Sequence, residues 1–284
     1  MNSGGVGNLG RTIDGVYASF AASVMNNSAP LTVPHEARMP TSSTALEARD
    51  VRKAYGPTVA LDGVSLTVER GSCTALVGES GSGKTTLLRC FNAMVVPDEG
   101  VVRVAGEDVR GTDSVGLRRS VGYVQQEGGL LPHWTILRNV SLVPWLANDP
   151  DAPDRARRAL DLAGLPPDEF GGRWPRELSG GRRQRAAFAR ALAGEPDVVL
   201  LDEPFGALDA ITRVDVQRTF ASLRAKLGFT VLLVTHDLRE AFDLSDQVAV
   251  MRAGRAEQIG DPDALRADAD TAYVAELLDK AGIS

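Results

Sequence analysis

Residues 78–85 read Gly-Glu-Ser-Gly-Ser-Gly-Lys-Thr and match the pattern G-x-x-x-x-G-K-[ST]. Glycines at these positions let the backbone wrap with its N–H groups pointing inward, and a helix that starts there adds positive partial charge. The ammonium group of Lys84 is suited to neutralise the outer phosphates of a nucleotide, and the hydroxyl of Thr85 is suited to bind Mg²⁺. We therefore predict a phosphate loop that consists of Gly78, Glu79, Ser80, Gly81, Ser82, Gly83, Lys84, Thr85 and Thr86.

The sequence on both sides of the phosphate loop favours this interpretation over a glycine-rich turn with a surface lysine. An apolar run at 74–77 predicts a strand that enters the loop, and residues 85–94 predict a helix that leaves it. Further apolar or β-branched runs predict strands at 46–51, 64–68, 101–104, 121–124, 198–201 and 231–234. Because these runs alternate with helical patterns from about Leu46 onward, the sequence predicts an α/β domain.

One region inside the domain departs from this alternation. Strand patterns are absent between residues 130 and 177. Within that region, residues 154–165 place four apolar side chains on one helical face, and Gly164 stands where the helix should stop. We therefore predict a helical insertion over about 127–180.

The two ends of the chain lie outside the predicted α/β pattern. Residues 1–44 are rich in Gly, Ser, Asn, Ala and Pro and have no sustained period, which predicts a mobile leader. The mildly apolar run 16–25 also resembles part of a signal peptide, but no convincing cleavage site follows it. Residues 264–278 predict one mildly amphipathic helical stretch. The predicted organisation is a leader (1–44), a nucleotide-binding domain (45–265) and a C-terminal helical tail (266–284).

Composition excludes several classes of protein. The formal net charge of −6 argues against binding nucleic acid through general neutralisation of its phosphates. The longest apolar runs are far shorter than the ~18–20 residues that a membrane span requires. The two cysteines, Cys73 and Cys90, cannot form a disulfide framework and belong to no zinc-binding pattern, which favours a reducing, cytoplasmic setting.

A second stretch supplies the chemistry for hydrolysis. Residues 198–203 read Val-Val-Leu-Leu-Asp-Glu, which predicts a buried strand that ends in two acids. The carboxylate of Asp202 is suited to bind Mg²⁺, and that of Glu203 is suited to act as general base toward water. Two acids after a strand are by themselves more often a solvated strand end. Together with the phosphate loop they predict nucleotide hydrolysis.

Residues 178–185 read Leu-Ser-Gly-Gly-Arg-Arg-Gln-Arg and resemble the signature motif of ATP-binding cassette (ABC) ATPases, commonly LSGGQ, with Arg182 where Gln is usual. The resemblance covers nearly all of residues 46–260, with the motifs in the family's order. It implies a P-loop NTPase fold, with a RecA-like core, an antiparallel β subdomain and a helical subdomain that carries the signature. It also implies ATP and Mg²⁺ as cofactors.

The resemblance assigns further site residues. Tyr55 corresponds to the aromatic residue that stacks on adenine, although a packed strand-end aromatic is the alternative. Gln126, rather than Gln125, aligns with the Q-loop glutamine, and Asp209 lies in the D-loop, residues 206–209. His236 corresponds to the switch histidine. The residues implied are as follows: for catalysis, Glu203, His236 and Gln126; for metal, Thr85, Gln126 and Asp202; for the nucleotide, Tyr55, Asp209 and the phosphate loop.

The signature motif has a physical explanation of its own. Ser179 is a good N-cap, and the helix predicted after it should stop near Gly194. The N-terminus of such a helix is an anion site. The phosphate loop already surrounds the phosphates of one nucleotide, so this second site should serve another. In ABC proteins two chains associate head to tail, which implies that Ser179, Gly180 and Gly181 contact the ATP of a second copy or of a paralogous ATPase.

Three kinds of ABC protein remain as candidates. A nucleotide-gated interaction protein is disfavoured because both Glu203 and His236 are present. A non-transport ABC ATPase usually has two cassettes or a long coiled-coil insertion, and this sequence shows neither pattern. The resemblance therefore favours the ATPase subunit of an importer, peripheral on the cytoplasmic face of the membrane. Such a subunit binds integral membrane permease subunits and acts indirectly with an extracytoplasmic substrate-binding protein, without nucleic acid.

Five segments resemble those of the quaternary-amine uptake family, which imports glycine betaine, carnitine or choline. These are residues 122–126 (GYVQQ), 129–136 (GLLPHWTI), 139–140 (NV), 142–144 (LVP) and 202–213 (DEPFGALDAITR). Taurine, sulfonate and nitrate importers share part of the last segment and are the alternative. Only 48 residues follow His236 (284 − 236), too few for the pair of CBS regulatory domains in many members of that family, so we expect no regulation of that kind.

Overall fold

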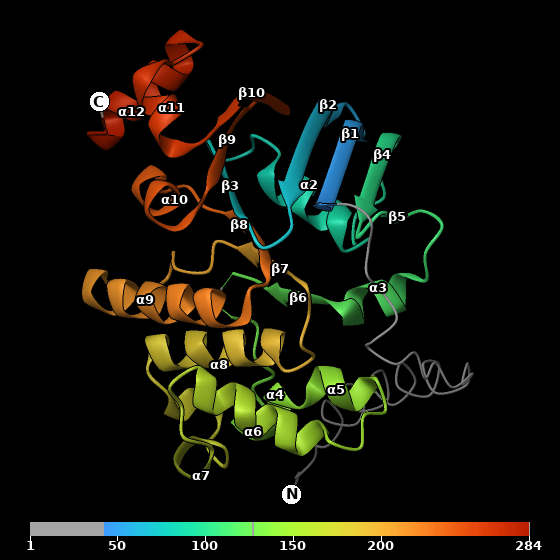
Figure 1. Ribbon diagram of the computed structural model, residues 1–284, viewed down its shortest axis with the longest axis vertical. Helices are drawn as coiled ribbons and strands as arrows, with labels where there is room; N and C mark the ends of the chain where they lie inside the picture. The colour runs from blue at the N-terminus through green and yellow to red at the C-terminus, as the bar shows by residue number, and fades with distance from the viewer. Residues whose placement is uncertain (1–42, 127, 284) are drawn as a thin grey trace, which may run out of the picture. The chain divides into compact units, whose positions relative to one another are not determined.

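A computed structural model describes residues 43–126 and 128–283 (Figure 1). Apart from Ser43 and Thr44, the predicted leader lies outside the described residues. The strands are β1 (Thr44–Tyr55), β2 (Thr58–Glu69), β3 (Cys73–Val77), β4 (Glu99–Val104), β5 (Glu107–Asp108), β6 (Val121–Val124), β7 (Val198–Asp202), β8 (Thr230–Val234), β9 (Gln247–Arg252) and β10 (Arg255–Gly260). All seven strands predicted from the sequence are present.

The helices lie between and after these strands along the chain. They are α2 (Lys84–Phe91), α3 (Ser114–Ser120), α4 (Ile136–Val140), α5 (Leu142–Leu146), α6 (Ala152–Leu162), α7 (Pro167–Phe170), the short 3₁₀ helix η2 (Pro175–Glu177), α8 (Gly180–Leu192), α9 (Ala210–Leu227), α10 (Leu238–Leu244), α11 (Pro262–Ala267) and α12 (Ala272–Ala281). None of the helices in the described part of the chain is long and apolar enough to cross a membrane.

The central sheet has six strands in the order β10-β9-β3-β8-β7-β6. Its strands β9, β3, β8, β7 and β6 pair in parallel, and β10 is an antiparallel edge strand. Every residue of β3, β7 and β8 is buried, as expected for strands covered on both faces. One apolar cluster contains Phe188, Phe205 and Phe220, which bring α8 and α9 against one face of this sheet. The prediction of an α/β fold is confirmed.

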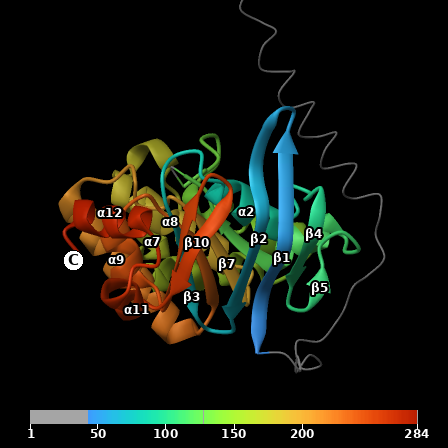
Figure 2. The ribbon, with the colours of Figure 1, turned by 90° about the horizontal axis from the view of Figure 1, so that it is seen from above.

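A second sheet is antiparallel, with the order β2-β1-β4-β5 (Figure 2). Its strands β1 and β2 are twelve residues each, longer than the predicted runs, and a turn at Gly56 and Pro57 joins them. The buried side chains of this sheet pack with Leu87, Leu88 and Phe91 of α2. This sheet therefore supports the helix that follows the phosphate loop.

The helices α4 to α7 and η2 form the predicted insertion, with a cluster of its own around Ile136, Leu160 and Phe170. In Figure 1 the insertion lies below α8, and α9 lies above α8. The cluster also includes Ala186 and Ala189 of α8, so this helix joins the insertion to the domain. As predicted, the chain leaves α6 at a glycine with left-handed backbone, because Gly164 has φ +70°.

The prediction of one helical stretch over 264–278 is wrong. The structure has two helices there, α11 and α12, separated at residues 268–271. Asp268 adopts an extended backbone, and the Thr271 side chain accepts a hydrogen bond from the N–H of Val274. This N-cap starts a new helix. Tyr273, Val274 and Leu278 of α12 are buried in the same cluster as the central sheet.

Candidate active site

The predicted catalytic residues follow the carboxyl ends of four neighbouring strands. The phosphate loop follows β3, and His236 lies two residues after the end of β8. Asp202 ends β7, Glu203 comes next, and Gln126 lies two residues after β6. Because these strands are parallel and adjacent in the sheet, their carboxyl ends lie at one edge. Residues that are far apart in the sequence are thereby brought together.

Two glycines of the phosphate loop have no room for a side chain. A Cβ on Gly78 would lie 2.0 Å from the carbonyl oxygen of Met251, and Gly78 has φ +141°. A Cβ on Gly83 would lie 2.4 Å from the carbonyl oxygen of Ala60. Gly83 is also the N-cap of α2 and provides no side chain to cap it. The first N–H groups of α2 are therefore left for an anion.

Lys84 is buried inside the phosphate loop. Its Nζ donates to the carbonyl oxygens of Gly78 and Glu79, both at 2.8 Å, and to Ser82 Oγ at 3.2 Å. Burial lowers the pKa of Lys84, and the negative charges of Glu203 and Asp202 oppose this shift. The ammonium group is thus surrounded by acceptors at the centre of the loop, where the phosphates of a nucleotide would add negative charge.

Thr85 and Asp202 form a pair of oxygen ligands suited to Mg²⁺. The Thr85 hydroxyl donates to Asp202 Oδ1 at 2.8 Å, and Asp202 is buried. Its Oδ2 accepts from the Tyr123 hydroxyl at 3.3 Å and lies 3.5 Å from an Arg89 nitrogen. Carboxylate and hydroxyl oxygens are the hard ligands that Mg²⁺ prefers, so these residues fit the ion. Gln126, the third predicted ligand, is exposed.

Tyr123 and Arg89 were not predicted from the sequence. Arg89 follows Thr85 by four residues in α2, so helical spacing indicates that both lie on one face. Tyr123 has no such local signal, because its place beside Asp202 depends on the pairing of β6 with β7.

Glu203 and His236 form the second polar pair at this edge. Glu203 Oε2 lies 3.3 Å from His236 Nδ1. The backbone of Glu203 is left-handed, with φ 48°, and its N–H donates to the carbonyl oxygen of Val234 at 2.9 Å. A Cβ on Gly206 of the D-loop would lie 3.7 Å from both Glu203 Oε2 and His236 Cε1. Gly206 of the D-loop therefore lies beside the carboxylate and the imidazole of its own chain.

Tyr55 lies at the end of β1 and is half exposed. The Lys53 ammonium lies 5.5 Å from the centre of its ring. Lys53 is in turn bonded to Asp98 Oδ1 at 2.8 Å, and Asp98 Oδ2 accepts from the N–H of Ala54 at 2.8 Å. The end of β1 is thus fixed with one aromatic ring open to solvent, as stacking on a base requires.

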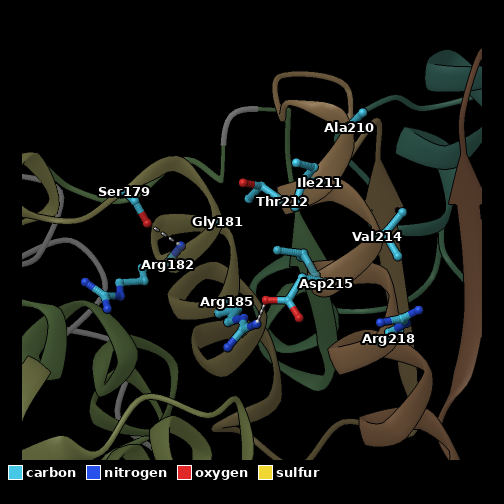
Figure 3. Close-up of a pocket in the computed structure, with 11 residues that line it drawn as sticks. Ser179, Gly181, Arg182, Arg185, Ala210, Ile211, Thr212, Val214, Asp215 and Arg218 are labelled. Carbon is cyan, nitrogen blue, oxygen red and sulfur yellow. Dashed lines mark hydrogen bonds and ion pairs between the residues drawn. The ribbon is translucent and has the colours of Figure 1, made fainter.

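The signature motif lies in a different place. Ser179 caps α8, because its Oγ accepts from the N–H of Arg182 at 3.4 Å. Ser179 and Gly181 line a groove of about 880 Å³ between α8 and α9, shown in Figure 3. Among the described residues, none from the phosphate loop lines this groove. The structure therefore does not bring the two predicted anion sites of one chain together.

Asp209 has a structural role that the sequence analysis missed. Its carboxylate caps α9 and accepts from the N–H of Thr212 at 3.0 Å. Hydrogen bonds from the side chain and the backbone of Thr212 lower the pKa of Asp209. An aspartate before a helical run is an N-cap signal that could have been recognised.

Comparison with known proteins gives consistent matches. The family model described as ABC transporter matches residues 61–206. The glycine betaine/carnitine/choline transport ATP-binding protein OpuCA of Bacillus subtilis (strain 168) is 41% identical over 238 residues, which cover 83% of this chain and 62% of that protein. The Fe(3+) ions import ATP-binding protein FbpC 1 of Rhodococcus jostii (strain RHA1) is 48% identical over 219 residues, covering 77% of this chain and 62% of that protein. The chain spans less than two thirds of the length of these relatives.

A solved structure matches the fold. The dimeric structure of the ATP-binding cassette MJ0796, in a post-hydrolysis state bound to ADP and Pi, has a TM-score of 0.68 and 32% identity to this chain. The match covers 76% of this chain and 98% of that chain.

Proposed function

Because the chain belongs to the ABC transporter family, we propose that it binds ATP with Mg²⁺ and hydrolyses it to power an importer in the membrane. The main support for this proposal is that two pairs of polar side chains lie at one edge of the sheet, next to the phosphate loop. One pair is Thr85 with Asp202, and the other is Glu203 with His236.

Binding of ATP would use the phosphate loop and the end of β1. The Lys84 ammonium and the free N–H groups of α2 would contact the phosphates, and Tyr55 would stack on the adenine. Thr85 and Asp202, with Gln126, would hold Mg²⁺, which neutralises charge on the phosphates when bound.

Hydrolysis would use Glu203 as the general base. Its carboxylate takes a proton from the water that attacks the γ-phosphorus, while the bond from that phosphorus to the bridging oxygen breaks. With a proton on Nδ1, His236 would donate a hydrogen bond to Glu203 Oε2, which lies 3.3 Å away. This bond would orient the carboxylate. Contact with the γ-phosphate requires a proton on the other ring nitrogen as well, since only an N–H can donate to a phosphate oxygen.

A second copy would complete each site. Ser179 and Gly181, on either side of Gly180, line a groove apart from the phosphate loop of their own chain. A head-to-tail pair would place the N-terminus of α8 over the ATP of the partner. The dimeric state of the solved cassette supports this arrangement.

We infer that the permease subunits dock on the helical insertion. A groove of about 360 Å³ there is lined by apolar side chains that include Trp134, Leu137 and Trp145, and Trp145 is half exposed. The groove overlaps the end of segment 129–135, whose residues resemble those of the quaternary-amine family, because Trp134 and Thr135 line it. Docking at this place would hold the chain peripherally on the cytoplasmic face of the membrane, with the substrate-binding protein on the other side.

The proposed solutes are quaternary amines such as glycine betaine, carnitine and choline. The resemblance to OpuCA over 83% of this chain supports this class. Ferric iron is the second candidate, because the FbpC relative is 48% identical over a slightly shorter span. Taurine, sulfonate or nitrate is a weaker alternative that rests on the sequence motif at residues 202–213.

One test addresses ATP hydrolysis, and a separate test addresses the identity of the transported solute. Purified chain should release phosphate from ATP only when Mg²⁺ is present, and no release at any protein concentration would refute the ATPase. Cells with and without the gene should differ in uptake of labelled glycine betaine, carnitine or choline at raised osmolarity. If uptake of all three is unchanged while ferric iron or sulfonate uptake is lost, the quaternary-amine proposal is wrong.

A further inference from the structure

A buried carboxyl group lies behind the switch histidine. Glu240 of α10 is 6% exposed, and its two oxygens bind different elements. Oε1 accepts from Gln217 Nε2 of α9 at 2.8 Å, and Oε2 accepts from the Thr235 hydroxyl. Burial raises the pKa of Glu240, and these two hydrogen bonds oppose the shift. Burying such a group costs free energy unless it is hydrogen-bonded, and these two bonds offset that cost.

Thr235 connects Glu240 to the backbone on both sides of His236. The Thr235 oxygen accepts from the N–H of Asp237 at 3.1 Å, while the N–H of Thr235 donates to the carbonyl oxygen of Leu76 at 3.1 Å. Thr235 is fully buried, whereas the His236 side chain is 63% exposed. Within the described part of the chain, the imidazole contacts Glu203, and the Thr235 hydroxyl fixes the backbone on either side of it.

A second contact from α9 reaches the same loop. Arg213 lies one turn before Gln217, so the two side chains lie on one face of α9. Its guanidinium donates to the carbonyl oxygen of Leu208 in the D-loop at 3.2 Å and lies 3.5 Å from Asp237 Oδ2. The helix that begins after the D-loop thus contacts Asp237 and Glu240, which both follow His236, and reaches Thr235 through Glu240.

We propose that Glu240 is a positioning residue for His236, and that the bonds from Gln217 to Glu240 and from Glu240 to Thr235 set the direction in which the imidazole points. The inference rests on the proposed hydrolysis, in which His236 orients Glu203. Glu240 itself does not touch Glu203 or the phosphates in this account. Because α9 starts at the D-loop, a shift of that helix would turn His236.

The first experiment removes the hydroxyl that joins Glu240 to the loop. Thr235→Val keeps the size of the side chain and loses both of its hydrogen bonds, and Thr235→Ser keeps them. We expect kcat for ATP hydrolysis to fall ~10–100-fold in Thr235→Val and to stay near that of the unaltered chain in Thr235→Ser, because small displacements of a reacting group have effects of this size. The dissociation constant for ATP should not change, since Lys84 and the phosphate loop are untouched.

The second experiment exchanges the two groups of the Gln217–Glu240 pair. Gln217→Glu alone places two carboxylates together and should lower kcat. Adding Glu240→Gln restores one carboxylate facing one amide, which should recover most of the activity. Asp246→Asn is the matched control, because Asp246 accepts from the N–H of Cys73 at the opposite edge of the sheet and binds Arg224 there. That variant should keep the kcat of the unaltered chain.

Side-chain NMR of His236 distinguishes a role of Glu240 in positioning the imidazole from a role in the general stability of the fold. The chain has three histidines, His35, His133 and His236, so each resonance can be assigned by single substitution. Thr235→Val and Gln217→Glu should shift the His236 resonance, and the exchanged double variant should return it, whether or not ATP is turned over.

Two results would overturn the inference. One is a His236 resonance that is unchanged in both impaired variants, and the other is an exchanged double variant that folds and binds ATP yet is no more active than Gln217→Glu. An unaltered chain without any ATPase activity would instead refute the proposed function, and the resonance of His236 would still decide the role of Glu240.

Discussion

Glu203 combines a left-handed backbone with a side chain held by an imidazole. Its φ of 48° is a conformation that costs a non-glycine residue about 1–3 kcal/mol. The hydrogen bond to the carbonyl oxygen of Val234 and the 3.3 Å approach to His236 maintain it. Strain of this kind persists where the surroundings fix a residue for its function. Six other non-glycine residues among those described also have positive φ, so the proposed role of Glu203 rests on its place beside His236 and the phosphate loop rather than on its backbone alone.

Replacing Glu203 tests this role directly. Glu203→Gln keeps the shape of the side chain but cannot accept a proton, so we expect unchanged ATP affinity and a rate of hydrolysis lower by ~10²–10⁴. Calorimetry and phosphate release measure the two quantities. Glu195→Gln is a matched control, because Glu195 also has a left-handed backbone, φ 52°, and lies after α8. Equal losses in the two variants would contradict a role specific to Glu203.

Lys84 should act on binding rather than on the chemical step alone. Lys84→Ala removes a buried ammonium group from the centre of the phosphate loop, where it has three acceptors. Hydrogen bonds to charged groups contribute about 1.5–3 kcal/mol, so ATP should bind ~10–100-fold more weakly. Titration calorimetry measures this, with Lys226→Ala on the exposed side of α9 as the control. Unchanged affinity for ATP in Lys84→Ala would show that the phosphate loop does not bind the nucleotide.

At the scale of elements, α8 and α9 pack closely because of one glycine. A Cβ on Gly181 would lie 2.5 Å from Thr212 Cγ2. Gly181→Ala should therefore force the helices apart and destabilise the fold by about 1–3 kcal/mol. Thr212→Ala removes the methyl group in the way and keeps the backbone N–H that binds Asp209. The double variant should recover most of the stability in thermal unfolding, and equal instability of the single and double variants would refute this packing account.

At the scale of the whole molecule, the signature motif and the phosphate loop lie apart in one chain. If each signature acts on the ATP of a partner, specific ATPase activity should rise with protein concentration. In a mixed dimer with Ser179→Ala in one chain only, hydrolysis should fall mainly at the site that this chain's α8 completes. Single-turnover measurements with one active site per dimer can distinguish the two sites. Full activity in a sample that stays monomeric would contradict the arrangement.

The sequence by itself determined the phosphate loop, the apolar strands and the N-cap at Ser179, because each depends on residues a few positions apart. A glycine that must be left-handed, an apolar run or a capping hydroxyl acts through the local backbone. The same local reasoning missed the break between α11 and α12, where Thr271 begins a second helix.

Only the tertiary structure decided which side chains meet. Thr85 and Asp202 are 117 positions apart and are bonded because α2 follows β3 at the same edge where β7 ends. Glu203 reaches His236, and Gln217 reaches Glu240, for the same kind of reason. The two acids after an apolar run predicted Glu203, and the resemblance to a family named His236, but neither named Tyr123, Arg89 or Glu240. Pairing between distant strands sets those contacts, and the free energy of that pairing depends on the whole core and leaves no periodic pattern along the chain.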